Sequence, residues 1–245
     1  MPLSFTHMSA AALITALIVT FFAAAVQGVV GIGFAIVSVP ILALINPSLA
    51  PVPQLLIVLP LTVSMAWRER NHIQLSGVGW IIGGRIPGAI IGVGLLAVAT
   101  QQTLDIMIAL VVLAAVAIIA SGFHVKRTPF SEFGAGVASG VSGLVASIGG
   151  PPLALLYSRD DGPTVRSNVA AIFTIGLLIT ISTRVLTGNI TLSDVRVAVT
   201  LFPALVAGYL VSFRFKDRVS QGVVRNAILL LALVGAVGLI IRAVV

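Results

Sequence analysis

Eight apolar runs follow one another along the chain, and they constrain its fold more than any other feature. They cover residues 8–45, 52–67, 77–99, 103–123, 132–157, 165–186, 191–213 and 222–245. A helix crosses the hydrocarbon core of a bilayer with about 20 apolar residues, and most of these runs have that length. Charged residues make up only 9% of the chain, whereas a soluble domain carries about 25%. The sequence therefore predicts an all-α polytopic membrane protein.

The net charge of +7 would indicate a nucleic acid partner in a soluble protein, but in a membrane protein it is expected in the cytoplasmic loops. The chain contains no cysteine, which excludes disulfides and thiol catalysis. The three histidines, His7, His72 and His124, lie in loops or at the ends of runs, and no group of side chains has metal-ligand spacing. We therefore expect no nucleic acid partner, no metal and no other cofactor.

Two of the apolar runs are interrupted in a similar way. Glycine and proline interrupt them at Gly28, Gly31, Gly33 and Pro40 in the first and at Gly140, Gly143, Gly149, Gly150, Pro151 and Pro152 in the second. At an offset of 112 residues, GVVG at 28–31 lies over GVSG at 140–143, and PILAL at 40–44 lies over PLALL at 152–156. The two interrupted runs are therefore copies of one another.

Weaker matches extend the duplication beyond these two runs. Gln54 meets Asn168 at an offset of 114, and Pro87 and Gly92 meet Pro203 and Gly208 at 116. The duplication covers nearly the whole chain. We expect a first membrane repeat at 1–123, a polar cytoplasmic linker at 124–130 and a second membrane repeat at 131–245.

The positions of the basic residues distinguish two topologies. If each interrupted run crosses the membrane once, the Lys and Arg near the ends of runs divide seven to six between the two sides. If each enters and leaves on the same side, as a hairpin or two short passes, they divide ten to three, as the positive-inside rule requires. The ten cytoplasmic residues are then Arg68, Arg70, Lys126, Arg127, Arg159, Arg166, Arg214, Lys216, Arg218 and Arg225, and the three outside are Arg184, Arg196 and Arg242.

The second topology gives the two halves opposite orientations and places both termini outside. Inverted repeats with discontinuous helices are a recurrent architecture of secondary transporters. We therefore expect two inverted repeats, each made of a broken or re-entrant helical hairpin and three transmembrane helices.

The two interruptions are the expected binding site. Backbone amides at bilayer depth must be satisfied or must line a wet cavity enclosed by protein, and a helix that restarts there directs free N–H groups at a small anion. The turning residue is expected within 28–40 and within 140–152. The expected substrate-binding residues of these segments are Gly28, Gly31, Gly33, Ser38, Pro40, Ser142, Ser147, Gly149, Gly150 and Pro151. Alternatively, the glycines only permit close helix packing, as we expect for those in 79–92.

Three polar residues in or near the apolar runs are further candidates. Arg85 lies well inside the run 77–99, where a charge costs on the order of 2.5–3.5 kcal/mol on insertion scales. It either faces the cavity and attracts an anion or extends toward the cytoplasmic interface. Gln54 and Asn168 either donate amide hydrogens to substrate oxygens or bond to a neighbouring helix. Weaker candidates, because such hydroxyls often bond back to their own helix, are Thr174, Thr180, Ser182 and Thr183.

The Gly-x-Ser-Gly pattern at 140–143 is similar to that of rhomboid-type intramembrane serine proteases. That chemistry needs a base within hydrogen-bond reach of Ser142, and no histidine lies inside a run, so we do not expect an enzyme. No carboxylate lies in the middle of a run either, and those near run ends are expected to cap helices: Asp105, Glu132 and Asp194. Coupling to a proton or sodium ion, uniport and the oligomeric state all stay open.

The sequence resembles the sulfite exporter TauE/SafE family, also called the TSUP superfamily, over almost its full length. The resemblance rests on the glycine-rich segments that end at 39–42 and at 149–153, on the basic turn at 68–70 and on the glycines at 83–92. The first copy departs from the family pattern, with Val37 and Ser38 where members often carry a run of glycines. The resemblance implies an inner-membrane secondary transporter of small sulfur-containing anions such as sulfite, sulfonates or thiosulfate.

Residues and resemblance together predict a transporter that moves such an anion by exchanging inward-open and outward-open states. Two other classes remain open. A passive anion channel would show a flux that does not saturate with anion concentration, and it would show no counter-transport. A non-transport membrane protein would be either the intramembrane protease or a subunit of a larger assembly.

Overall fold

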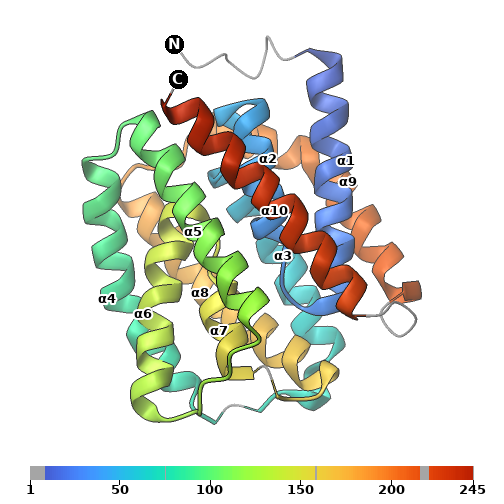
Figure 1. The fold of residues 1–245 in the computed structure, drawn as a ribbon, viewed down its shortest axis with the longest axis vertical. Helices are drawn as coiled ribbons and strands as arrows, with labels where there is room; N and C mark the ends of the chain where they lie inside the picture. Colours follow the sequence, from blue (N-terminus) through green and yellow to red (C-terminus); the bar gives the residue numbers. More distant parts are fainter. Residues whose placement is uncertain (1–8, 75, 158, 216–220, 245) are drawn as a thin grey trace.

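The computed structural model describes residues 9–74, 76–157, 159–215 and 221–244, and helices are the only regular structure in them (Figure 1). Two of the ten basic residues assigned to the cytoplasmic side, Lys216 and Arg218, and also His7, lie outside the described residues. The elements are α1 (Ala10–Val30), α2 (Phe34–Ile45), η2 (Pro47–Leu49), α3 (Val52–Arg68), η3 (Arg70–His72), α4 (Val78–Ala97), α5 (Gln101–Ser121), α6 (Pro129–Ala146), α7 (Gly150–Tyr157), α8 (Gly162–Leu186), α9 (Leu192–Phe215) and α10 (Gln221–Val244).

Seven of the described helical segments are long and apolar enough to cross a membrane: α1, α3 with η2, α4, α5, α8, α9 and most of α10. The predicted all-α membrane fold is therefore confirmed. The six helices expected to span are among them, and α1, expected as one arm of a hairpin, is a seventh with 21 residues. Its counterpart α6 has 18 residues and the helices after the two breaks are shorter still, with 12 residues in α2 and 8 in α7.

The first break separates α1 from α2 at residues 31–33, and the second separates α6 from α7 at residues 147–149. Gly31 and Gly33 adopt φ angles of 100° and 121°, which L side chains rarely adopt. Ser147 has a φ of 58°, in the left-handed region that ends many helices. The breaks lie 116 residues apart, so the structural register of the two halves differs by four from the 112-residue register of the best sequence match. Four residues are about one helical turn, which keeps the glycines on the same face in both registers.

The helix pairs of the structure are compatible with two inverted repeats. α4 packs against α6 as α1 packs against α9, α3 contacts α9 as α8 contacts α4, and α2 contacts α10 as α7 contacts α5. The helices α1 to α5 of the first half correspond in order to α6 to α10 of the second half. Exchanging corresponding helices converts the first contact of each comparison into the second. Figure 1 shows the beginning of α1 and the end of α10 at one end of the bundle and the α5–α6 connection at the other. The hairpin α1–α2 therefore enters from one end and α6–α7 from the opposite end.

Two arginines occupy equivalent places in the two halves. Arg68, the last residue of α3, donates from Nη2 to the carbonyl oxygen of Gly28 at 2.9 Å. Arg184, near the end of α8, donates in the same way to the carbonyl oxygen of Leu144. The two donor residues are 116 positions apart in the sequence, and so are the two acceptor residues. Each arginine thus satisfies a carbonyl in the last turn of the helix that precedes a break, where basic side chains are favourable.

Close glycine packing joins α4 to α6. A Cβ atom at Gly88 would overlap the carbonyl oxygen of Val137, and one at Gly140 would lie 2.7 Å from the carbonyl oxygen of Arg85. Gly84 and Gly136 make similar backbone contacts across the same interface. The packing role expected for the α4 glycines holds for Gly84, Gly88 and Gly92 but not for Gly79 and Gly83, which have no atom within 4 Å of an added Cβ, and the same role extends to Gly140.

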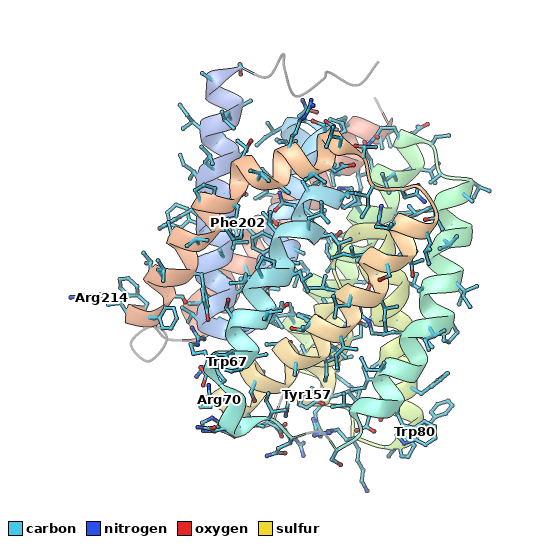
Figure 2. All side chains as sticks on the ribbon, turned by 180° about the vertical axis from the view of Figure 1, so that it is seen from behind. Trp67, Arg70, Trp80, Tyr157, Phe202 and Arg214 are labelled. Carbon is cyan, nitrogen blue, oxygen red and sulfur yellow. The ribbon has the colours of Figure 1, made fainter. Side chains whose placement is uncertain are left out.

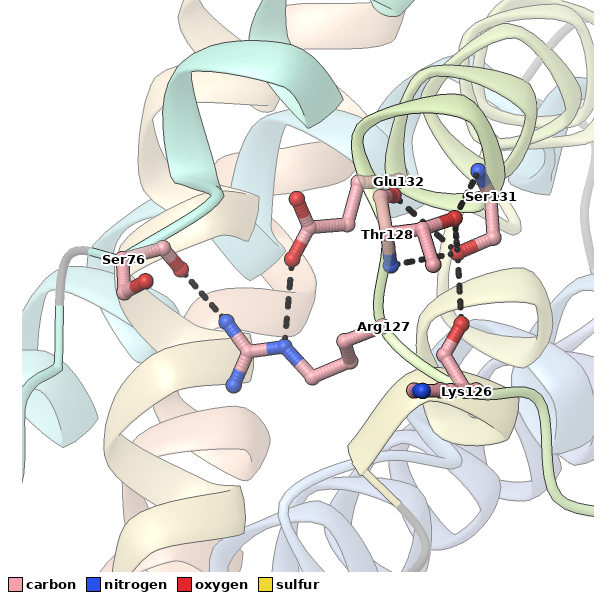
Figure 3. A network of polar contacts seen from close by, with 6 residues as sticks. All are labelled: Ser76, Lys126, Arg127, Thr128, Ser131 and Glu132. Atoms are coloured by element: carbon pink, nitrogen blue, oxygen red, sulfur yellow. Dashed lines mark hydrogen bonds and ion pairs between the residues drawn. The ribbon is translucent and has the colours of Figure 1, made fainter.

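A polar network fixes the end of the bundle at which α6 begins (Figure 3). Arg127 pairs with Glu132 at 3.2 Å and donates to the carbonyl oxygen of Ser76, which ties the start of α6 to the α3–α4 connection. The Thr128 hydroxyl accepts from the Ser131 amide in a capping box. At the same end, Figure 2 shows Trp67 and Trp80 near the level of Arg70. Such an arrangement of exposed tryptophans is typical of a membrane–water interface.

Candidate functional site

Both helix breaks line one small cavity inside the bundle, of about 30 Å³. The first break and α2 contribute Gly33, Ala35 and Ile36. The second break and α7 contribute Ser147, Ile148, Gly149 and Gly150, and the remaining walls are Gln27, Val58, Arg85, Gly143, Phe173, Leu177 and Thr180. A cavity needs about 10–15 Å³ of such space to hold one water, so the central cavity has room for only about two waters in the present conformation.

Arg85 is the only charged residue in the cavity wall within the described part of the chain, and it is 2% exposed. Its Nη1 donates to the Ser139 hydroxyl at 2.7 Å, and that hydroxyl donates to the carbonyl oxygen of Gly149 at 2.6 Å. Gly176 provides the space for the guanidinium, because a Cβ there would overlap Cζ of Arg85. Among the described residues, Nε of Arg85 has no hydrogen-bond partner and no carboxylate forms an ion pair with the guanidinium. The cavity therefore borders an uncompensated positive charge.

Gln27, in the last turn of α1, supplies a second free donor. Its Oε1 accepts from the backbone N–H of Phe34 at 3.1 Å, which caps the beginning of α2 across the first break. Its Nε2 is buried and has no partner among the described residues. Because buried donors are rarely left without acceptors, Gln27 and Arg85 together indicate a site for an acceptor-rich ligand.

A larger cavity of about 440 Å³, the vestibule, lies next to the first break. Its walls come from the first break, the end of α5, α7 and the beginnings of α8 and α10. The charged residues that line it are Arg159, Arg225 and Asp160, together with His124. Gly33 lines both cavities, so the backbone of the first break separates them.

The structure brings together five of the residues expected at the site: Gly33, Arg85, Ser147, Gly149 and Gly150 all line the central cavity. The other expected residues do not line it: Gly28, Gly31, Ser38, Pro40, Gln54, Ser142, Pro151 and Asn168. Gly28 packs against Ser212, and Gly31 against the Arg166 backbone, so each has a packing role. The Ser147 hydroxyl donates to the carbonyl oxygen of Pro51 at 3.0 Å.

The two prolines of the expected site differ in position. Pro151 is the second residue of α7, where a proline costs no helix hydrogen bond. Pro40 lies inside α2, which begins at Phe34, and packs against Gly235. Ser38 is fully buried without lining the cavity, and its hydroxyl has no partner among the described residues.

The two amides matched in the sequence have different surroundings. Nε2 of Gln54 donates to the carbonyl oxygen of Leu49 at 3.1 Å, close to the beginning of α3. Oδ1 of Asn168 accepts from the backbone N–H of Gln74 at 2.7 Å and so connects α8 to the segment that precedes α4. In the 116-residue register, Gln54 corresponds to Ala170 and not to Asn168. Oε1 of Gln54 and Nδ2 of Asn168 are buried without a partner among the described residues, and neither residue lines the central cavity.

Several residues of the cavity were missed by the sequence reasoning. Gln27 is a polar residue one turn before the first break, and its position inside an apolar run is the signal that indicates it. Phe173, Leu177 and Thr180 lie on one face of α8, at successive turns of the helix. Since Thr180 was a weak candidate, counting back from it in helical turns identifies Leu177 and Phe173. Gly143 was recognised as an interruption of its run but not as part of the wall.

The remaining polar candidates bond locally. The hydroxyl groups of Thr174, Thr180 and Thr183 each donate to the carbonyl oxygen four residues earlier, as expected. Ser142 does the same toward Ala138. Asp194 caps α9 by accepting from Thr191, whereas the other two carboxylates form ion pairs, Asp105 with Arg242 and Glu132 with Arg127.

The sequence matches one protein family, described as sulfite exporter TauE/SafE, over residues 16–239. The chain belongs to this family. The TauE/SafE family consists of membrane transporters and not of enzymes, and its exporters act on sulfite and related anions. With seven helices apolar enough to span, this TauE/SafE protein is a multi-pass membrane protein. Neither a curated protein nor a solved structure matches the chain significantly.

Proposed function

We propose that this protein carries small sulfur-containing anions of the sulfite, sulfonate or thiosulfate class across the cell inner membrane by alternating access. One observation carries the proposal: the guanidinium of Arg85 is buried beside both helix breaks without a carboxylate partner among the described residues. A charge at this depth is costly and marks a functional position in membrane proteins. An anion that reaches the central cavity would neutralise it.

The free hydrogen-bond donors fit the same ligand class. Arg85 Nε and Gln27 Nε2 have no acceptor among the described residues, and both residues line the cavity. A sulfite, sulfonate or thiosulfate anion presents several oxygen acceptors to such donors. Charge-assisted hydrogen bonds of this kind are about twice as strong as neutral ones.

The sizes of the two cavities support alternation between states. The central cavity, at about 30 Å³, must expand before it can hold an anion, whereas the vestibule already offers about 440 Å³. The vestibule lies at the end of the bundle with the α5–α6 connection, which the basic residues assign to the cytoplasm. We therefore assign the present conformation as occluded, with a cytoplasmic vestibule and both termini outside.

The test is anion flux into liposomes that contain the purified protein. We expect saturable uptake of radiolabelled sulfite, thiosulfate or sulfoacetate, and a loss of at least about tenfold in Arg85→Gln, since a hydrogen bond to a charged group contributes about 1.5–3 kcal/mol. The variant is expected to fold, because removing a buried charge without an ion-pair partner removes its desolvation cost. Arg196→Gln, which changes an exposed arginine on α9, is the matched control.

The flux assay also separates the alternatives. Full uptake by Arg85→Gln would contradict the proposed site, and flux that does not saturate would indicate a channel. None of the described carboxylates lines the central cavity, so a proton would have to couple through another group or travel with the anion. Repeating the assay with a pH gradient and with a sodium gradient identifies the coupling ion.

A further inference from the structure

One face of α8 runs from the vestibule to the central cavity. Val165 and Val169 line the vestibule, whereas Phe173, Leu177 and Thr180 line the central cavity. These residues are spaced by four, four, four and three positions, which is the spacing of a single helical face. An anion moving from the vestibule toward Arg85 therefore passes along this face and meets Phe173 between the two cavities.

The partition between the cavities is narrow and apolar. A methyl group added at Gly150, the first residue of α7, would lie 3.0 Å from Cζ of Phe173 and 3.6 Å from Cγ2 of Ile32. Ile32 lines the vestibule and Phe173 lines the central cavity, so side chains from both cavities meet beside Gly150. Both are only partly buried, as expected for residues that border open space.

We infer that Ile32 and Phe173 form an apolar gate that selects anions by size before they reach Arg85. The inference rests on the proposed function and adds the residues that determine specificity. Neither side chain offers a hydrogen bond, so an anion crosses the partition only when the side chains separate. The width of that opening then decides how large an organic group attached to the sulfur can pass.

The backbone beside Ile32 supplies the movement. Ile32 is the residue between Gly31 and Gly33, both of which have positive φ angles. Glycines of this kind are suited to absorb the dihedral changes of a hinge. The equivalent residue of the second half, Ile148, is buried and borders only the central cavity. The gate therefore belongs to the first break alone.

Single cysteines test the gate directly, because the chain has none of its own. Val165→Cys and Leu177→Cys place a thiol on the two sides of Phe173 along the same face of α8. We expect a sulfonate-bearing methanethiosulfonate reagent to label Val165→Cys rapidly in inside-out vesicles and slowly in intact cells. It should label Leu177→Cys at least about tenfold more slowly than Val165→Cys, since passage requires gate opening.

Removing the aromatic ring should open the partition. Phe173→Ala is expected to raise the labelling rate of Leu177→Cys toward that of Val165→Cys, and Phe173→Leu, which keeps more of the packing, by a smaller factor. Phe202→Ala, at a lipid-facing position of α9, is the matched control and should leave the rate unchanged. Equal labelling of the two cysteines with Phe173 intact, or no acceleration in either Phe173 variant or in Ile32→Ala, would overturn the gate.

The size filter is measured by flux. In liposomes, Phe173→Ala should raise the uptake rate of a butanesulfonate relative to sulfite by about tenfold, the discrimination that one or two methylene groups give in an apolar pocket. An unchanged ratio overturns the selection by size. The labelling rates do not depend on transport, so they judge the gate even if the anion flux proposed above is not found.

Discussion

The two helix breaks occupy equivalent places in the two halves but are built differently. The first has two glycines with positive φ angles around Ile32, is capped by the Gln27 side chain, and separates the vestibule from the central cavity. The second turns at Ser147 and borders only the central cavity. Near it, Arg85, Ser139 and the carbonyl of Gly149 form a continuous chain of hydrogen bonds.

We expect this difference to give the two breaks separate roles in the proposed transport. The first break has the conformational freedom and the apolar tip that a gate requires. The second break has the polar contacts that hold a charged side chain in place at the cavity. In the 116-residue register, Arg85 corresponds to Leu201 and Ser139 to Ala23, so the positive charge exists in one half only. The proposed anion site is therefore not symmetric between the two halves.

Among the variants that test the comparison of the two breaks, the largest effect is expected from Arg68 and Arg184, the equivalent arginines of the two halves. Arg68→Ala should lower the free energy of unfolding by about 1.5–3 kcal/mol, the contribution of a hydrogen bond from a charged donor. Arg68 also pairs with Glu69 and lies over the rings of Tyr209 and Phe213, whereas the described partner of Arg184 is the Leu144 carbonyl. Arg184→Ala should therefore cost less, because it also removes the desolvation penalty of a buried charge.

Thermal unfolding of the two variants in detergent measures this order. The double variant should show additive losses, since the two arginines lie at opposite ends of the bundle. If Arg184→Ala lost as much stability as Arg68→Ala or more, the expectation that Arg68 contributes more to stability than Arg184 would be wrong.

A smaller effect is expected from the equivalent glycines Gly33 and Gly149. Gly33→Ala forces a non-glycine residue to a φ of 121°, which costs on the order of 1–3 kcal/mol, and its Cβ would approach Ile228 and Val26 at 3.2 Å. Gly149 has no positive φ, and its Cβ would approach the Ser139 hydroxyl at 3.0 Å and Arg85 Nη1 at 3.3 Å.

Gly33→Ala should therefore mainly lower the melting temperature, and Gly149→Ala should mainly weaken anion binding. Melting curves and sulfite affinities of the two variants separate these effects. The reverse pattern would show that the hinge lies in the second break.

The smallest effect is expected from Ser139→Ala, which gives the second half the residue that the first half has at this position. Arg85 then loses a hydrogen-bond partner, and we expect the affinity for sulfite to fall by about two- to tenfold, as for one hydrogen bond of 0.5–1.5 kcal/mol. Ser121→Ala, whose exposed hydroxyl bonds to its own helix, is the control. Equilibrium binding of radiolabelled sulfite measures both, and an unchanged affinity would remove Ser139 from the site.

Local patterns predicted the fold and part of the site. Hydropathy indicated the spanning helices, and the interruptions at 28–40 and 140–152 contained both breaks, because a helix break at bilayer depth needs glycine or proline. Arg85 was recognised because a charge inside an apolar run is conspicuous. Gln27 carries a similar but weaker signal, because an uncharged amide is less conspicuous in an apolar run, whereas the role of Phe173 depends on which helix lies opposite it.

The sequence by itself determined an all-α membrane protein of the TauE/SafE family with two similar runs that glycine and proline interrupt. Only the tertiary structure decided which glycines pack against another helix and which line the central cavity. Gly140 packs against α4, whereas Gly149 lines the cavity, although both belong to the same interrupted run. The four-residue difference between the sequence register and the structural register has the same origin. One helical turn leaves the face of a helix almost unchanged, so the pattern of glycines alone does not distinguish the two alignments, and the contacts of the folded chain do.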